Sequence, residues 1–103
     1  MSSSVQTDMN IEVVSIKKAA LVFRAINHNL RRHMVQLLHQ NARMTVTQLY
    51  VKLRLEQSVA SQHLAILRKA GLVSTERQGK FIFYSVNYGR LKQIQELAGN
   101  LLK

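Results

Sequence analysis

The spacing of apolar residues along the chain predicts a series of short helices. From Ile11 onward, apolar side chains recur every three or four residues, which is the period of an amphipathic helix. The first such stretch is apolar on two sides, with one face at Ile16, Ala20, Phe23 and Ile26 and another at Val14, Leu21 and Ala25. A helix of this kind either lies centrally or buries one side in a partner chain. The pattern therefore gives a first indication of a dimer.

Two polar segments mark the starts of the next two helices. Asn27-His28-Asn29 interrupts the first helix, and either asparagine can cap the second one. The apolar face of that second helix consists of Leu30, Met34, Leu37 and Leu38. The segment Thr45-Val46-Thr47-Gln48 has the pattern of a capping box, with Thr45 as the N-cap residue. We therefore expect a short third helix to follow Thr45.

A fourth helix is predicted after a brief turn at Leu55-Glu56. It ends at Lys69-Ala70-Gly71, where basic residues precede a glycine suited to a left-handed conformation. Its inward positions are Ala60, Leu64 and Leu67, and its outward positions are Gln57, Ser58, Ser61, Gln62 and Arg68. Two short helices joined by a tight turn, the second with a polar outer face, are typical of a helix-turn-helix.

Beyond this helix the period of the pattern changes from 3.6 to 2. Residues 73–77 and 81–86 are rich in β-branched and aromatic side chains and flank Gln78-Gly79-Lys80. This arrangement predicts a β-hairpin in which the glycine adopts a positive φ. Arg77 and Lys80 flank its tip.

The closing segment predicts one more helix, which completes a recognisable order of elements. Leu91, Ile94 and Leu101 share one face of it with either Leu97 or Ala98. Four helices, a β-hairpin wing and a C-terminal helix make a mainly α (α+β) winged helix-turn-helix. We expect the aromatic residues of the hairpin to form its core rather than stacking platforms; they are Phe81, Phe83 and Tyr84.

Composition adds a strong positive charge to this picture. The 103 residues include 15 Lys and Arg but only 5 Asp and Glu, so the formal net charge is +10. A chain of this size buries roughly two-thirds of its unfolded surface, which is enough for one core. We expect a disordered, Ser-rich lead-in over residues 1–10 and one domain over residues 11–103. The charge favours nucleic acid as the partner, with an anionic membrane or plain solubility as the alternatives.

Several classes of protein are excluded by what the sequence lacks. The longest apolar run is Ala19–Phe23, whereas a membrane-spanning helix needs about 20 residues. No secretory signal is visible at the start, and the absence of cysteine excludes disulfides and thiolate sites and fits a cytoplasmic protein. The five carboxylates are scattered and the glycines form no phosphate-binding loop, so we expect no enzymatic activity and no cofactor.

The outward face of the fourth helix is the strongest candidate for function. It carries uncharged groups that can hydrogen-bond to base edges, whereas a merely solvated face usually holds more Glu and Lys. The candidates for base reading are Gln57, Ser58, Ser61 and Gln62, and those for phosphate contacts are Arg68, Arg77 and Lys80. His63 either contacts phosphate or packs against the turn. We therefore predict that this face binds double-stranded DNA.

Other basic residues and the histidines are weaker candidates. We expect Arg31, Arg32, Arg43, Lys52 and Arg54 to widen the basic surface. No adjacent pair among His28, His33, His39 and His63 has the four-residue spacing that shares a helix face. The histidines therefore predict no metal site within one helix, and they leave convergence across a dimer open.

Three stretches of the chain match motifs that occur together in one family. Residues 23–31 (FRAINHNLR) resemble F-K-A-L-A/S-D-P-T-R, residues 57–73 (QSVASQHLAILRKAGLV) resemble Q-S-x-V-S-x-H-L-x-x-L-R-x-A-G-L-V, and residues 77–84 (RQGKFIFY) resemble R-x-G-R/K-x-x-x-Y. The chain thus resembles the ArsR/SmtB family of winged-helix repressors over about residues 11 to 102. It departs from the first motif at His28-Asn29, which replace Asp-Pro.

The resemblance implies a homodimer formed through the first and last helices. Each recognition helix would then enter a major groove, each wing would contact the backbone or minor groove, and the operator would be pseudo-palindromic. Relatives that sense metal use a C-V-C-like pair at positions that are Thr45 and Thr47 here, or ligands on the last helix, where only Glu96 is available. Neither familiar metal site can form.

The function expected from the sequence is therefore a sequence-specific, dimeric transcriptional repressor. Two alternatives are a winged-helix module that binds an acidic protein and an architectural protein that binds DNA without sequence preference. A protein-binding module often has apolar residues on the outward face, which argues against the first alternative. The second alternative is distinguished from a sequence-specific repressor by the ratio of the affinities for operator and random DNA.

Overall fold

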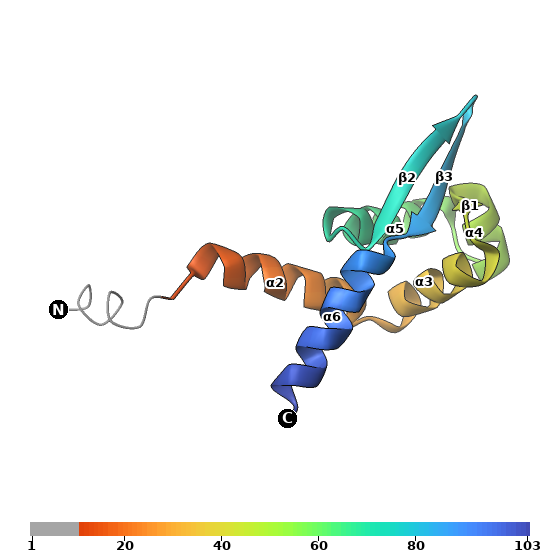
Figure 1. Ribbon diagram of the computed structural model, residues 1–103. Coiled ribbons are helices and arrows are strands. Elements are labelled where there is room, and N and C mark those ends of the chain that lie inside the picture. The colour runs from red at the N-terminus through yellow and green to blue at the C-terminus, as the bar shows by residue number, and fades with distance from the viewer. Residues whose placement is uncertain (1–10) are drawn as a thin grey trace.

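A computed structural model describes residues 11–103 as a mainly helical body with a projecting hairpin (Figure 1). The expected lead-in over residues 1–10 lies outside the described residues. The elements in chain order are α2 (Val13–Ile26), α3 (Asn29–Asn41), β1 (Met44–Thr45), α4 (Val46–Leu53), α5 (Gln57–Lys69), β2 (Val73–Gln78), β3 (Phe81–Val86) and α6 (Tyr88–Leu101). This order confirms the predicted winged helix-turn-helix.

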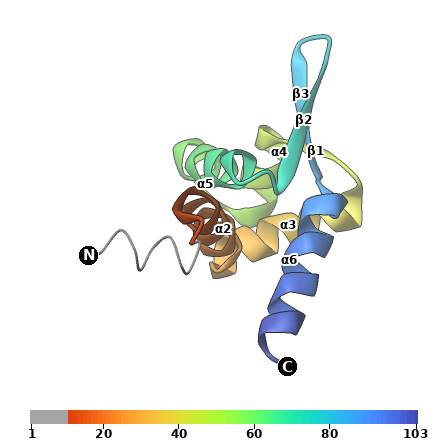
Figure 2. The same ribbon diagram turned by 60° about the vertical axis from the view of Figure 1, so that its left-hand side comes forward.

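The core lies where α3, α4 and α5 meet the base of the sheet. Its largest fully buried side chains are Met34, Leu38, Leu49, Leu64, Leu67 and Leu72. Most of these residues occupy the apolar faces that helical spacing predicts. The hairpin and α6 point away from this body in opposite directions, and α2 reaches out to one side (Figures 1 and 2).

The sheet has three antiparallel strands in the order β1-β3-β2. β2 and β3 form the predicted wing, and Gly79 at its tip has a φ of +62°. The sequence did not predict β1, because two residues are too short to show a period. In β1, Met44 pairs with Tyr84 and Thr45 pairs with Phe83, so the base of the wing is fixed directly to the start of α4.

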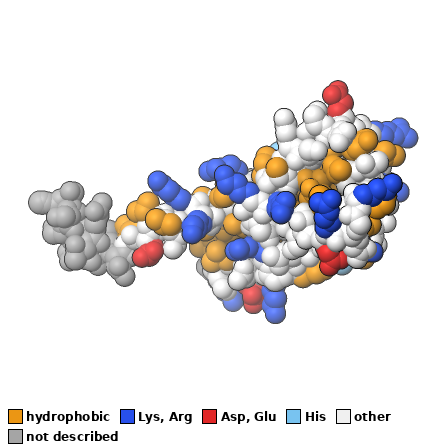
Figure 3. All heavy atoms as spheres, turned by 90° about the horizontal axis from the view of Figure 1, so that it is seen from above, with side chains coloured by type: hydrophobic (Ala, Val, Ile, Leu, Met, Phe, Trp, Pro, Cys, Tyr) orange, Lys and Arg blue, Asp and Glu red, His pale blue; other side chains and the backbone are white. Residues whose placement is uncertain are grey.

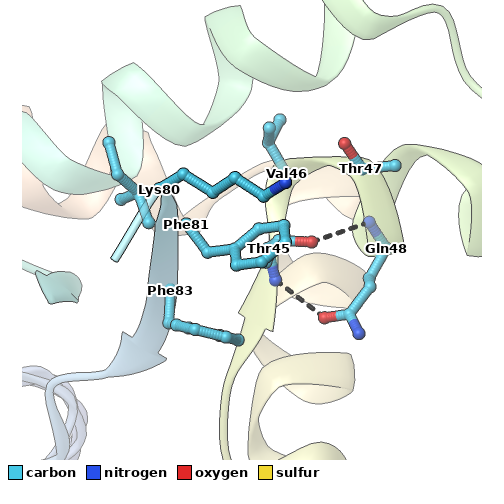
Figure 4. A pocket seen from close by; sticks show the side chains of 8 residues that line it. Thr45, Val46, Thr47, Gln48, Lys80, Phe81 and Phe83 are labelled. Carbon is cyan, nitrogen blue, oxygen red and sulfur yellow. Dashed lines mark hydrogen bonds between the residues drawn. The ribbon is translucent and has the colours of Figure 1, made fainter. Parts of the chain in front are cut away.

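The helix starts confirm one predicted cap and correct another. Thr45 and Gln48 form the capping box: the Gln48 N–H donates to Thr45 Oγ1 (3.2 Å), and the Thr45 N–H donates to Gln48 Oε1 (2.9 Å; Figure 4). The cap of α3 is His28, whose Nδ1 accepts from the Leu30 N–H at 3.2 Å. The prediction that an asparagine caps α3 was therefore wrong. The Oδ1 atoms of Asn27 and Asn29 instead accept hydrogen bonds from the Arg32 guanidinium.

Arg31 also differs from its predicted place on the basic surface, because it is buried with only 8% of its area exposed. Its Nε donates to the Ala25 carbonyl (2.7 Å) and its Nη2 to the Arg24 carbonyl (3.2 Å), while its Nη1 lies 3.2 Å from His63 Nδ1. A buried charge needs such partners to offset the loss of water. Arg31 therefore joins the end of α2, the start of α3 and the middle of α5.

The surroundings of His63 favour its neutral form. A guanidinium can only donate, so His63 Nδ1 must accept, and this requires the neutral ring. The ring centroid of His63 also lies 4.9 Å from that of His28. Burial, and then the neighbouring His28 and Arg31, hold the pKa of His63 below its usual value. The neutral form of His63 is therefore part of the folded structure.

We predict that acid destabilises the fold through His63. Because the folded state favours neutral His63, the unfolded chain binds more protons, so the stabilisation is complete above about pH 6.5 and is lost as the pH falls toward the lowered pKa. Chemical denaturation at several pH values between 5 and 8 measures this dependence. The His63→Gln side chain has an amide oxygen that can still accept from Arg31. This variant should reduce the number of protons taken up on unfolding by up to one, so its free energy of unfolding should depend less on pH.

The matched control is His33→Gln, which changes an exposed histidine of α3. It should keep the pH dependence of the unmodified protein. Identical pH profiles for both variants and the unmodified protein would contradict the assignment.

Candidate nucleic-acid interface

The outward face of α5 carries the predicted base-reading residues, and all of them are exposed. Burial of Ala60, Leu64 and Leu67 on the opposite side fixes the rotation of the helix about its axis. The exposed residues of the first half of α5 are Gln57, Ser58, Ser61 and Gln62, and Arg68 is exposed in the last turn. The structure thus presents short, uncharged hydrogen-bonding groups at the N-terminal end of the helix.

The turn before α5 leaves the first N–H groups of that helix without a side-chain cap. Arg54 adopts a left-handed conformation with a φ of +57°, and its N–H donates to the Val51 carbonyl at 3.2 Å. Glu56 occupies the N-cap position of α5, but its side chain caps no backbone N–H. The N–H groups of a helix start can bind phosphate oxygens. The start of α5 can therefore contact the DNA backbone as well as base edges.

The wing presents two exposed basic residues near its tip. The Arg77 Nε donates to the Gly79 carbonyl at 3.2 Å, and the Lys80 ammonium lies 5.5 Å from the centre of the Phe81 ring. Phe81 is 52% exposed, so its predicted place in the core of the hairpin was wrong. It lies one residue from the tip and lines an open cavity between the wing and the start of α4, so much of its ring stays exposed (Figure 4). Phe83 is half-buried beneath the Arg43 guanidinium, 4.3 Å from its ring centre.

His63 packs against the junction of α2 and α3, where it contacts Arg31 and lies beside the His28 ring, and not against the turn at Leu55-Glu56. Through this contact His63 links α5 to Arg31. Its predicted contact with phosphate stays a prediction. A helical spacing could have identified Arg31, because residues 31, 34, 35 and 38 share one face of α3 and all are buried.

Positive charge is largely uncompensated on the surface. Among residues 11–103, the only ion pair is Arg43–Glu76, at 3.6 Å. Arg32, Lys52 and Arg54 are exposed, as predicted. In the view of Figure 3, Lys and Arg side chains spread across the face and Asp and Glu side chains are few. Such a surface attracts a polyanion over a distance of about one Debye length, roughly 8 Å at physiological salt.

The histidines do not form a recognisable metal site. No group of three or more His, Asp or Glu side chains that could hold a metal ion occurs in the described part of the chain. His28 and His63 do lie together, but each uses its Nδ1 as a hydrogen-bond acceptor. A metal-bound histidine usually binds through one nitrogen and donates from the other. In this arrangement both Nδ1 atoms of the pair already have hydrogen-bond partners.

Exposed apolar side chains also gather around the start of α2 and the end of α6. The exposed residues at the start of α2 and the end of α6 are Ile11, Val13, Val14, Ile16, Leu97, Leu101 and Leu102. Figure 3 shows hydrophobic side chains along the arm formed by α2. No helix within residues 11–103 has the length and hydropathy needed to cross a membrane. These apolar side chains are therefore candidates for contact with another protein surface.

Comparisons with known proteins agree with this geometry. A family model described as the bacterial regulatory protein, arsR family, matches residues 28–75. An HTH-type transcriptional regulator of Methanocaldococcus jannaschii is 35% identical over 85 residues, covering 82% of this chain and 96% of the relative. The transcriptional activator HlyU of Vibrio cholerae is 34% identical over 84 residues, covering 82% of this chain and 77% of the relative.

The transcriptional repressor PagR of Bacillus anthracis is similar in both sequence and structure. It is 33% identical over 94 residues, covering 91% of this chain and 94% of the relative. Its crystal structure matches with a TM-score of 0.68 at 32% identity, over 84% of this chain and 99% of that chain. The chain therefore belongs to the ArsR family, and it is a winged helix-turn-helix, DNA-binding transcriptional regulator.

Proposed function

We propose that this regulator reads a specific, pseudo-palindromic operator as a homodimer and represses transcription by occluding a promoter. The observation that carries the proposal is the exposed, uncharged polar surface at the start of α5, held at the outer edge of a helix-turn-helix. Residues 11–103 serve as one DNA-binding and dimerisation domain. Since its target is the chromosome, the protein acts in the cytoplasm of the cell.

In this proposal, three groups of residues divide the work of binding. The basic surface attracts the duplex and supplies affinity without sequence preference. Gln57, Ser58, Ser61 and Gln62 read base edges in the major groove, where glutamine suits adenine N6 and N7. Arg68, Arg77 and Lys80 contact phosphates and fix the orientation of the protein. His63 acts through Arg31 as a positioning residue and does not touch DNA in this scheme.

The proposed dimer interface consists of α2 and α6. Their exposed apolar side chains face solvent in the single chain, and burying them against a second copy would gain about 25 cal/mol per Å². Two-fold pairing would place two copies of α5 about one DNA turn apart, roughly 34–36 Å, which matches a pseudo-palindrome. PagR is named a repressor and HlyU an activator, so the direction of regulation is part of the proposal.

Substitutions on α5 and on the wing should have different effects. Gln62→Ala should weaken operator binding by about 1–3 kcal/mol per half-site and relax base preference, because it removes a base contact. Lys80→Ala should weaken binding to operator and random DNA alike and reduce the slope of log affinity against log salt by about 2 per dimer. Fluorescence anisotropy with both duplexes measures each effect. Equal losses of affinity on both duplexes for both variants would contradict the distinction between base-reading and phosphate-contacting residues.

The dimer interface can be tested by placing charge on it. Leu97→Asp should shift the protein toward monomer at micromolar concentration and weaken operator binding at least tenfold, because a buried unpaired carboxylate opposes association. Sedimentation velocity measures the change. Val51→Asp is the matched control, since Val51 is 64% exposed on α4, outside the proposed interface. A Leu97→Asp protein that sediments like the unmodified dimer would place the interface elsewhere.

A further inference from the structure

A cavity at the junction of α2, α5 and α6 gathers positive charge that DNA reading by the start of α5 does not use. Its volume is about 490 Å³, and its lining consists of Ser15, Lys18, Ala19, Leu21, Val22, Lys69, Ala70 and Arg90. The three basic residues come from three different helices: Lys18 from α2, Lys69 from the last turn of α5, and Arg90 from the first turn of α6. Cations from separate elements thus line one cavity.

None of these three cations forms an ion pair among the described residues. The single ion pair of residues 11–103 is Arg43–Glu76, which is elsewhere. Glu12 is the acidic residue nearest along α2, and it accepts a hydrogen bond from the Ser15 hydroxyl at 3.3 Å. Like charges around one cavity repel each other, and a basic residue in the first turn of α6 also opposes the helix dipole. An anion in the cavity would relieve both unfavourable terms.

The backbone beside the cavity leaves room for the Arg90 side chain and holds the start of α6. Gly71 has a φ of +75°, and a Cβ added there would lie 3.1 Å from Arg90 Nε and 3.3 Å from Nη2. The absence of a side chain therefore gives the guanidinium room beside the end of α5. Asn87 holds the start of α6 to the same loop: its Nδ2 donates to the Gly71 carbonyl (2.8 Å), and its Oδ1 accepts from the Arg90 N–H (3.2 Å).

Apart from Ser15, the rest of the lining is apolar. It consists of Ala19, Leu21, Val22 and Ala70, so the site offers both charge and hydrophobic surface. A volume of 490 Å³ lies in the range of small-molecule sites, about 300–1,000 Å³. Three cations in such a space suit an oxyanion with two or more negative charges, because guanidinium and ammonium groups are the usual protein partners of phosphate.

We propose that this cavity is a phosphate-binding site, formed by Lys18, Lys69 and Arg90, for a phosphate group carrying at least two negative charges in a free compound or for the DNA backbone. Either source supplies the same chemistry. The site touches both helices of the proposed dimer interface and the end of α5, so its occupancy would act on DNA reading. That consequence rests on the proposed function, whereas anion binding itself does not.

The test uses inorganic pyrophosphate as the probe and isothermal titration calorimetry at low salt as the measurement. The cavity variant is Lys18→Gln, Lys69→Gln and Arg90→Gln combined. The control variant removes the same number of charges from exposed residues that do not line the cavity: Lys17→Gln, Lys92→Gln and Lys103→Gln. Thermal melts establish that each variant folds. Arg90→Lys, which retains the charge, provides a fourth protein if the triple variant does not fold.

We expect the unmodified protein and the control variant to bind pyrophosphate alike and the cavity variant to bind at least tenfold more weakly. Arg90→Lys should bind at an intermediate strength, because it keeps the charge and loses the planar fork. Equal weakening in the cavity and control variants would overturn the proposal, since general surface charge would then explain the binding. Failure of the unmodified protein to bind pyrophosphate would also overturn it.

A second arm distinguishes the two sources of phosphate. If a free compound is the ligand, the cavity variant should keep the operator affinity and salt dependence of the control variant, while pyrophosphate changes operator affinity only in proteins with an intact cavity. If the DNA backbone is the ligand, the cavity variant should have a smaller salt slope than the control. An unmodified protein that binds pyrophosphate but no DNA would contradict the proposed function and leave the anion site standing.

Discussion

The buried guanidinium of Arg31 joins the three helices on which the geometry of this protein depends. It makes hydrogen bonds to the carbonyls at the end of α2 and to His63 of α5, and no carboxylate within the described residues neutralises it. Because each of its three nitrogens has a hydrogen-bond partner, the charge is tolerated in the interior. Loss of this side chain would leave two carbonyls and one ring nitrogen without partners. Arg31 therefore helps the apolar core to fix the direction of α5 relative to α2.

This link connects the proposed dimer helix with the helix that faces outward. The exposed surface of α5 can remain free of internal contacts because the opposite side of that helix is fixed twice, by its apolar residues and by His63. The wing is held similarly, since the short pairing of β1 with β3 attaches its base to the start of α4. A rigid support for exposed polar side chains favours base reading, because little conformational freedom is lost on binding.

The sequence predicted those features that depend on local chemistry. The capping box at Thr45, the positive φ of Gly79 and the helical periods all follow from interactions within a few residues. The errors fall where distant residues meet. The sequence predicts Arg31 on the surface because its partners lie on other helices, and it favours asparagine over His28 because asparagine is the commoner cap. The candidate base-reading residues were found from spacing alone, whereas the orientation of His63 required the packing of α5 on α3.

The central claim is that the outward face of α5 reads DNA sequence in a dimer. Its most direct test is to incubate the protein with a pool of random duplexes at near-physiological salt and to sequence the retained DNA. The account predicts enrichment of a pseudo-palindrome whose half-sites are about one helical turn apart. Uniform retention of all sequences would contradict it and identify a non-specific DNA binder. Absence of retention even at low salt would contradict DNA binding altogether.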